Sequence, residues 1–283
     1  MKVIANFIMV TFSIIGICAF LGLFVGEIDL NLHSFWNNCL SIFDFFLDPY
    51  QDLVHPYTKE SFNLFPGFWS YYIYSVIIFC SSLLLAFLLG NLLTFITILL
   101  PKKVSERIVY IVTILEALPD IFIIIVIQFS VVQIFKNTGV LLFPVAGAFE
   151  KAYFLPIVTL SILPLILFFK ISVLLNQDEY QKTYVEFGLS KGLSNLYLLF
   201  VHIFRNTLVS LYNHAKSINW VMLSNLVMFE RLFNIYGITY VILIYPNIEV
   251  IAFCLVLFFV PIYLLLNLYR FFINQLTNEK VNF

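Results

Sequence analysis

Long apolar stretches alternate with short polar segments along most of the chain. A helix needs roughly 20 predominantly apolar residues to cross the hydrocarbon core of a bilayer, which is about 30 Å thick. We predict that every stretch meeting or nearly meeting this length forms a membrane-spanning helix. The six predicted spans are residues 7–25, 71–100, 108–135, 152–175, 207–229 and 250–269. The expected fold class is therefore an all-α membrane protein with six transmembrane helices.

The composition supports a membrane protein. Of the 283 residues, 62% are hydrophobic and only 11% are charged, and the mean hydropathy is +0.99. Soluble domains usually contain about 25% charged residues, so a soluble protein is excluded. The 15 Lys and Arg residues are balanced by 16 Asp and Glu residues, which leaves no basic excess for binding nucleic acid. The four cysteines lie far apart, so neither a disulfide framework nor a zinc site is predicted.

The positive charges predict that both chain ends lie in the cytoplasm. Lys and Arg are enriched in the cytoplasmic loops of membrane proteins. If the N-terminus is inside, ten of these residues fall on the cytoplasmic side and four on the other, with Lys216 inside a span. A cleaved signal peptide is the alternative for the first stretch, and the lack of a small-x-small cleavage site before the polar region disfavours it.

The predicted spans divide the chain into three regions. Residues 1–70 contain the first helix and an external loop from 27 to 70, residues 71–275 form the membrane core, and residues 276–283 form a cytoplasmic tail. The external loop mixes acidic and aromatic side chains, which is typical of a segment lying at the membrane interface. A plain surface loop is at least as good an interpretation of it as a docking surface.

The longest cytoplasmic loop, residues 176–206, is predicted to fold as helix, turn and helix. Tyr180, Tyr184 and Phe187 recur at i, i+4 and i+7, which predicts an aromatic stripe on one helix face. A short amphipathic helix of this kind can fit a groove on a soluble partner. It can also rest on the lipid headgroups, and the periodicity does not distinguish these two interpretations.

The turn within this loop has its own local signals. Gly192 is suited to the positive φ that often follows a helix end. Ser194, two residues later, is suited to cap the next helix. The pair predicts a sharp reversal between two short helices.

The same loop resembles that of a known family. Residues 182–194 read KTYVEFGLSKGLS, and residues 202–206 read HIFRN. These segments resemble the cytoplasmic E-A-A-x-x-x-G loop of bacterial ABC importer permeases, in the version found in dipeptide, oligopeptide and nickel importers. Glu186 takes the place of the family's glutamate, and Gly192 that of its glycine.

Other segments keep the register of that family. They are similar to its I-P, L-P-A-L-T-L, E-T-V-F-x-x-P-G-L and D-Y-P motifs. The matching segments are residues 118–119, 155–160, 230–238 and 245–246. The resemblance covers about residues 65–272. Phe187 and Gly188 depart from it, because they stand where the family has two alanines.

The resemblance implies a type I importer permease fold and a place in the bacterial cytoplasmic membrane, surrounded by lipid. The chain would be the transmembrane subunit of an ATP-driven ABC importer for peptides or a similar small solute. Its partners would be a second permease subunit, identical or different, two ABC ATPase subunits and an extracytoplasmic substrate-binding protein. The resemblance leaves the substrate itself open.

No ATP site of its own is expected in this chain. A phosphate-binding loop requires G-x-x-x-x-G-K-[ST], and the sequence contains no Gly-Lys dipeptide. We therefore expect no bound cofactor and no enzymatic activity, with ATP used by the partner subunits. By the resemblance, the loop helix would insert into a groove on the ATPase. The residues expected to couple to the ATPase are Tyr184, Glu186, Phe187, Gly188, Lys191, Gly192, Leu193 and Ser194.

Ionisable residues inside the spans indicate a translocation path or an internal pair, because charges are costly there. Glu116 and Asp120 are four residues apart, so they should share one face of the third span. Lys216 lies at a comparable depth in the fifth span, and a Glu116–Lys216 pair is one hypothesis. The fifth span also carries a polar stripe that must face protein or water. The predicted path residues are Glu116, Asp120, Asn213, His214, Lys216 and Ser217.

Other functions fit some of these residues. An ATP-independent ion- or proton-coupled carrier or channel could use the same ionisable groups as a relay. The polar stripe could serve helix packing alone. An intramembrane enzyme is disfavoured because no catalytic signature accompanies Glu116, Asp120 or His214. The histidines are too scattered to predict a metal site.

Overall fold

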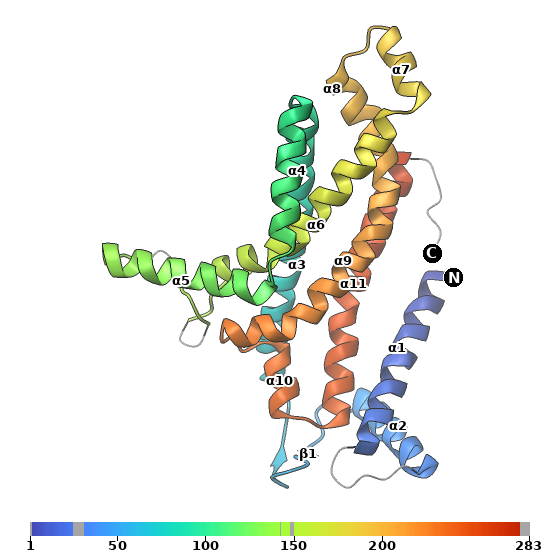
Figure 1. Cartoon of the computed structure of the whole chain (residues 1–283). Coiled ribbons are helices and arrows are strands. Elements are labelled where there is room, and N and C mark those ends of the chain that lie inside the picture. The colour runs from blue at the N-terminus through green and yellow to red at the C-terminus, as the bar shows by residue number, and fades with distance from the viewer. Residues whose placement is uncertain (1, 25–30, 142, 148–149, 278–283) are drawn as a thin grey trace. The chain divides into compact units, whose positions relative to one another are not determined.

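Figure 1 shows the computed structural model of the chain, which describes residues 2–24, 31–141, 143–147 and 150–277. Helices dominate the described residues, and the only strands there form a short hairpin. The elements are α1 (Lys2–Leu21), η1 (Gly22–Phe24), α2 (Leu32–Leu47), β1 (Leu53–Val54), β2 (Ser61–Phe62), α3 (Phe68–Leu99), α4 (Lys102–Glu116), α5 (Asp120–Thr138), α6 (Phe154–Tyr180), α7 (Thr183–Ser190), α8 (Asn195–Tyr197), the π-helical turn η2 (Leu198–Ile203), α9 (Phe204–Leu232), α10 (Ile238–Ile244) and α11 (Ile248–Thr277).

The all-α membrane fold is confirmed. Five helices in the described part of the chain are long and apolar enough to cross a membrane: Ile4–Phe24, Phe68–Leu99, Asp120–Thr138, Phe154–Tyr180 and Ile248–Leu276. The protein is therefore a multi-pass membrane protein. The predicted span at 207–229 is helical within α9, but polar residues keep α9 out of this apolar set. The predicted tail lies almost entirely outside the described residues, as do positions 27–30 of the external loop.

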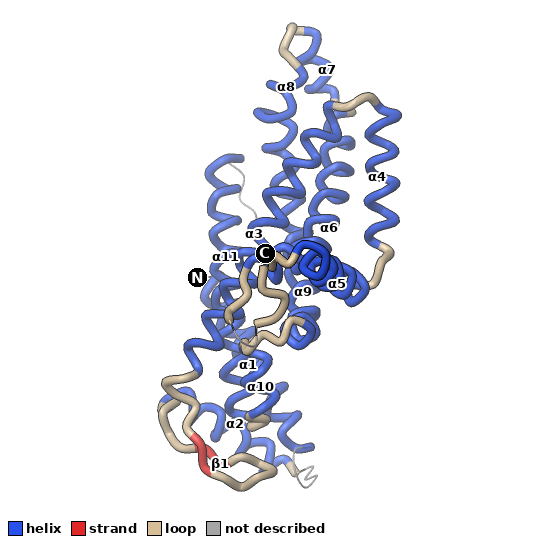
Figure 2. The backbone as a smooth tube through the Cα atoms, turned by 90° about the vertical axis from the view of Figure 1, so that its left-hand side faces the viewer, coloured by secondary structure: helices blue, strands red, loops and turns tan. Residues whose placement is uncertain are grey.

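The prediction of one continuous third span is wrong. Helix α4 ends at Glu116, and α5 begins at Asp120 after Pro119, whose backbone is extended (φ −62°, ψ 138°). Proline has no N–H for the helical ladder and disfavours helical geometry in the residue before it. In Figure 1, α5 runs steeply across the direction of α4, and Figure 2 shows α5 nearly end-on. The apolar run therefore contains a corner rather than a straight span.

The chain forms two compact units, Met1–Ile77 with Asn234–Leu264, and Ile78–Phe233 with Leu265–Phe283. In the first unit, α1, α2 and α11 enclose a small core of Cys18, Ala19, Ile42 and Ala252.

The β1–β2 hairpin of the first unit is attached to the segment before α11. The ring Nε2 of His55 donates to the carbonyl of Ile244 at 2.9 Å, and Asn247 Nδ2 donates to the carbonyl of Val54 at 2.9 Å. Phe62 also stacks on Tyr245, with ring centroids 4.2 Å apart. The described residues of the predicted external loop therefore include a hairpin that is fixed to the segment before α11.

The second unit is built around the contact of α3, α6 and α9. Its core contains Ala86 from α3, Phe168 from α6, and Leu211, Ala215 and Ile218 from α9.

Small and polar residues bring α3 and α6 together. A Cβ at Gly90 would lie 2.9 Å from the Phe168 Cβ, so only glycine fits at this crossing. Thr94 Oγ1 donates to the Phe169 carbonyl at 3.3 Å, and Ser172 Oγ donates to Asn91 Oδ1 at 2.7 Å. Close packing through small and hydrogen-bonding side chains is the usual way that helices associate in lipid.

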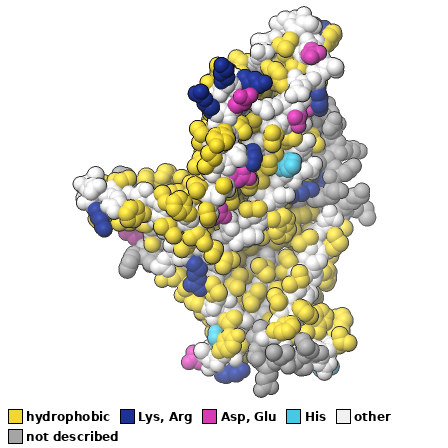
Figure 3. Space-filling model, in the orientation of Figure 1, with side chains coloured by type: hydrophobic (Ala, Val, Ile, Leu, Met, Phe, Trp, Pro, Cys, Tyr) yellow, Lys and Arg dark blue, Asp and Glu magenta, His cyan; other side chains and the backbone are white. Residues whose placement is uncertain are grey.

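Helix α5 has few contacts with the rest of the described chain. Most of its apolar side chains are exposed, including Ile121, Phe122, Ile125, Val126 and Phe129. Figure 3 shows hydrophobic side chains covering this helix on the face in view. Its surface is suited to lipid or to another protein.

Candidate functional site

The loop between α6 and α9 forms a structured tip beyond the ends of these helices (Figure 1). The predicted helix, turn and helix is confirmed: α7 is followed by a turn and then by α8. Gly192 has φ +81°, as expected for a residue just after a helix end. The Ser194 side chain accepts a hydrogen bond from the backbone N–H of Tyr197 at 3.2 Å, which caps the next helix.

Gly188 has a steric role in the tip. A Cβ at this position would lie 2.6 Å from Cδ2 of Leu198, which is closer than real side chains approach. The absent side chain lets α7 lie directly on η2. Val185 on the same helix joins Leu198, Leu199 and Ile203 in a buried cluster, and Phe95 and Ile98 at the end of α3 pack against it.

The predicted aromatic stripe does not lie on one helix. Tyr180 is the last residue of α6, and Tyr184 is in the first turn of α7. The chain turns at Gln181 and Lys182, which breaks the i, i+4, i+7 relation. Tyr184 is half-buried and packs against the Val185 cluster, whereas Phe187 is 61% exposed. Tyr184 therefore anchors the tip from inside. Of the three aromatic residues in the predicted stripe, only Phe187 is an exposed residue.

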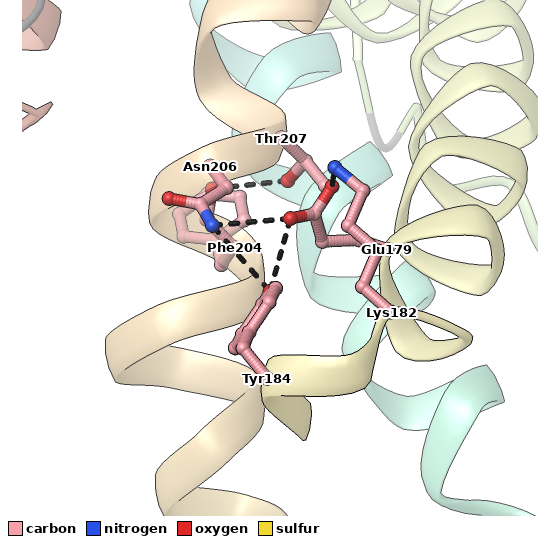
Figure 4. Close-up of polar contacts among 6 residues, drawn as sticks. All are labelled: Glu179, Lys182, Tyr184, Phe204, Asn206 and Thr207. Carbon is pink, nitrogen blue, oxygen red and sulfur yellow. Dashed lines mark hydrogen bonds and ion pairs between the residues drawn. The ribbon is translucent and has the colours of Figure 1, made fainter. Parts of the chain in front are cut away.

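A buried carboxylate joins the base of the tip to two long helices (Figure 4). Glu179 Oε1, from α6, accepts hydrogen bonds from the Tyr184 hydroxyl and from Asn206 Nδ2 of α9, each at 3.0 Å. Glu179 Oε2 forms an ion pair with Lys182 Nζ at 2.5 Å. Three helices thus meet at one acidic group.

The protonation state of Tyr184 suits its role as a hydrogen-bond donor in this network. Burial and the hydrogen bond to the Glu179 carboxylate raise the pKa of Tyr184 to about 12, so the phenol keeps its proton and remains a donor. Sequence reasoning missed Glu179 and favoured Glu186, which is exposed. The available signals were the i, i+3 spacing to Lys182 and the asparagine that ends the HIFRN segment.

The outer surface of the tip combines apolar and charged side chains. Lys191 Nζ lies over the ring of Phe187, 4.2 Å from its centroid. Other exposed residues at the tip include Glu186, Leu189, Leu193, Leu196 and Tyr197. This surface could contact a soluble protein or the lipid headgroups.

The ionisable residues of the membrane segments have partners other than those expected. Glu116 pairs with Lys170 of α6, with Oε2 and Nζ 2.5 Å apart, so the predicted Glu116–Lys216 pair is wrong. Lys170 lies within α6. Asp120 accepts a hydrogen bond from Asn225 Nδ2 of α9. Lys216 Nζ instead lies 4.9 Å from the ring centroid of Tyr212.

The break at Pro119 explains this rearrangement. Because α4 ends at Glu116 and α5 begins at Asp120, the two carboxylates do not share a helix face. Glu116 therefore meets α6, and Asp120 meets α9. Asp120 also lies in the first turn of α5, where a negative charge is favourable.

The polar stripe on α9 lies on an exposed face of the second unit. Asn213, His214 and Ser217 are exposed, as is Ser224 two turns later. The opposite face is buried, with Leu211, Ala215, Ile218 and Met222 in the core. Trp220, three residues after Ser217, lies on the same face and is 61% exposed, so the face combines polar and apolar side chains.

The described residues contain no group of three or more His, Cys, Asp or Glu side chains placed to hold a metal ion. The sequence matches no model of a known protein family, and no curated protein matches it either.

Proposed function

We propose that this chain is the transmembrane subunit of an ATP-driven ABC importer in a bacterial cytoplasmic membrane, carrying peptides or a similar small solute. The main observation in support is the Glu179 network, which connects an exposed, structured tip to both α6 and α9. The likeness of residues 182–206 to the coupling loop of importer permeases supports the same assignment. The tip would take up motion generated by ATP hydrolysis in a separate subunit.

The geometry of the tip suits the transmission of force. A lever must be stiff at its base, and here Glu179 holds α7 through Tyr184 and α9 through Asn206. The close approach of Gly188 to Leu198 adds a second attachment. A displacement of Phe187 would therefore move α6 and α9 together, as in a rigid-body switch.

The polar face of α9 suits a translocation path. If α9 crosses the membrane, its exposed Asn213, His214 and Ser217 need water or a second protein beside them. A second permease subunit facing α9 would enclose a polar passage between the two subunits. In this proposal α9 is the fifth crossing, and α4, the corner at 117–119 and α5 together count as the third. The chain then crosses the membrane six times, with both termini inside.

The partners follow from the same proposal. Two ABC ATPase subunits would hold the tips of two permease subunits and use the ATP. An extracytoplasmic binding protein would deliver the solute, and the hairpin at residues 53–62 is one surface that it could contact.

Affinity purification from native membranes in mild detergent tests the proposal. We expect stoichiometric ATPase subunits to co-purify with the tagged chain, and Phe187→Asp to abolish their binding. Trp36→Asp is the matched control, because Trp36 on α2 is 64% exposed against 61% for Phe187. Glu179→Gln should keep the ATPase bound, because the variant leaves the tip surface intact. A chain that purifies alone, or equal effects of the two aspartate substitutions, would contradict the proposal.

The Glu116–Lys170 pair favours a second candidate function, an ATP-independent carrier. Ion pairs between membrane helices can form part of a proton or ion relay. Such a carrier would keep transporting when ATP is depleted and stop when the proton gradient is collapsed. The importer is expected to show the opposite pattern.

A further inference from the structure

A shallow hollow on α4 brings together two cations, one carboxylate and one phenol. It has a volume of about 280 Å³ and is lined by Lys103, Glu106, Arg107 and Tyr110. Their spacing of i, i+3, i+4 and i+7 places all four on one side of the helix. Figure 3 shows basic side chains gathered with an acidic one over the start of α4.

The four side chains are free to bind a molecule from outside the chain. All four residues are exposed. Within the described part of the chain, none of them forms an ion pair or a side-chain hydrogen bond. The hollow also faces away from α6, because the less exposed positions 105, 108, 109 and 112 lie on the other side of α4. Glu116, which pairs with Lys170 of α6, lies on that other side as well.

The hollow lies where the chain leaves the hydrocarbon core. The apolar helix α3 keeps exposed apolar side chains up to its last residue, Leu99, and the cations begin three positions later. Along α4 the last exposed charge is that of Arg107, and Ile111 and Ile114 follow with 56% and 51% exposure. Tyr110 lies between them, and tyrosine is enriched at membrane interfaces. The hollow is therefore at the depth of the lipid headgroups, with the two isoleucines at the level of the acyl chains.

The charges of the hollow favour a headgroup that carries both signs. Lysine and arginine donate charge-assisted hydrogen bonds to phosphate oxygens, and a phenol can donate one more. The carboxylate of Glu106 would repel a headgroup that is only anionic, but it accepts hydrogen bonds from a primary ammonium group. A quaternary ammonium group has no N–H to donate. A phosphate ester that carries a primary amine therefore matches all four side chains.

We propose that this hollow binds the phosphoethanolamine headgroup of a membrane lipid. The phosphate lies between Lys103 and Arg107, and the ammonium group lies at Glu106. One acyl chain follows Ile111 and Ile114, which continue the same side of the helix. This site is separate from the loop tip, and it does not depend on the proposed importer function.

Photolabelling of the full chain in lipid nanodiscs tests the site. The probes are phosphatidylethanolamine, phosphatidylcholine and phosphatidylglycerol, each with a diazirine at the same position of one acyl chain, and adducts are mapped by mass spectrometry. We expect adducts on residues 108–116. Phosphatidylethanolamine should label about fivefold more than phosphatidylcholine, because the quaternary amine loses a hydrogen bond of about 1 kcal/mol. Phosphatidylglycerol should also label less, because Glu106 repels it.

Variants separate the two halves of the headgroup. Glu106→Lys should reverse the preference, so that phosphatidylglycerol labels more than phosphatidylethanolamine. Arg107→Gln should lower labelling by all three lipids, because all three carry the phosphate. Glu60→Lys and Lys136→Gln are the matched controls at exposed positions outside the hollow, and they should change neither result.

Several outcomes would overturn the proposal. Equal labelling by the three lipids in the wild-type chain, or strongest labelling by phosphatidylglycerol, would overturn the headgroup. Equal effects of Glu106→Lys and Glu60→Lys would show a long-range effect of charge rather than a contact. Absence of adducts on α4 would overturn the site. Competition by soluble phosphoethanolamine at the concentration of the probe would overturn the lipid as its occupant.

Discussion

Replacing Gly192 by alanine should loosen the loop tip by an amount that follows from the backbone. Gly192 has φ +81°, in the left-handed region where an L residue with a Cβ costs roughly 1–2 kcal/mol. A Cβ there would meet no atom within 4 Å, so crowding adds nothing to the backbone term. The tip should therefore open about 5- to 30-fold more often in the variant.

Amide hydrogen exchange measures this opening directly, because local unfolding exposes hydrogen-bonded amides to solvent. The relevant amides are those of Gly192, bonded to the Leu189 carbonyl at 2.9 Å, and of Leu193, bonded to the Gly188 carbonyl at 3.2 Å. The exchange of both amides should accelerate by this factor in the variant, after correction for the change in intrinsic exchange rate that the new side chain causes. Amides in α3 should not change.

Two further variants make the result decisive. Gly192→Asn should cost less than Gly192→Ala, because asparagine visits the left-handed region more readily. Gly16→Ala is the control: it lies in α1, has no positive φ and has open space around it, so alanine should not weaken it. Unchanged exchange in Gly192→Ala, or equal acceleration by alanine and asparagine, would refute the reasoning from backbone conformation.

Three other predictions concern polar contacts. Glu179→Leu should accelerate amide hydrogen exchange in α7 about tenfold, because it removes the shared acceptor. Glu179→Gln should have a smaller effect, because glutamine keeps one acceptor oxygen. Equal effects of the two variants would reject the network. Glu116→Lys combined with Lys170→Glu should recover the thermal stability lost in either single variant, whereas additive losses in the melting temperature would reject the pair. Ser217→Cys should react with a water-soluble maleimide and Leu84→Cys should not, and the reverse pattern would place the stripe of α9 in lipid.

The local geometry of the loop could be predicted from the sequence because its signals are local. A glycine after a short helix and a serine two residues on are enough to specify a left-handed residue and a cap. The long apolar helices could also be predicted, because length and hydropathy are properties of one segment.

Contacts between distant segments could not be predicted in the same way. Lys170 and Glu116 are 54 positions apart, and their pairing depends on how α4 packs on α6. Glu179 was overlooked because its partner Asn206 lies 27 positions away, across the whole tip. The straight third span was an error of a different kind. Its hydropathy pattern outweighed Pro119, although proline is a strong local signal for the end of a helix.

The corner at residues 117–119 has a mechanical consequence. The two carboxylates that flank it bind different helices: Glu116 forms an ion pair with α6, and Asp120 accepts a hydrogen bond from α9. If the tip moves α6 and α9 as one body, both attachment points move together, and residues 117–119 keep their backbone conformation. Helix α5 would then be carried along with the pair, so that its exposed apolar surface shifts whenever the tip does.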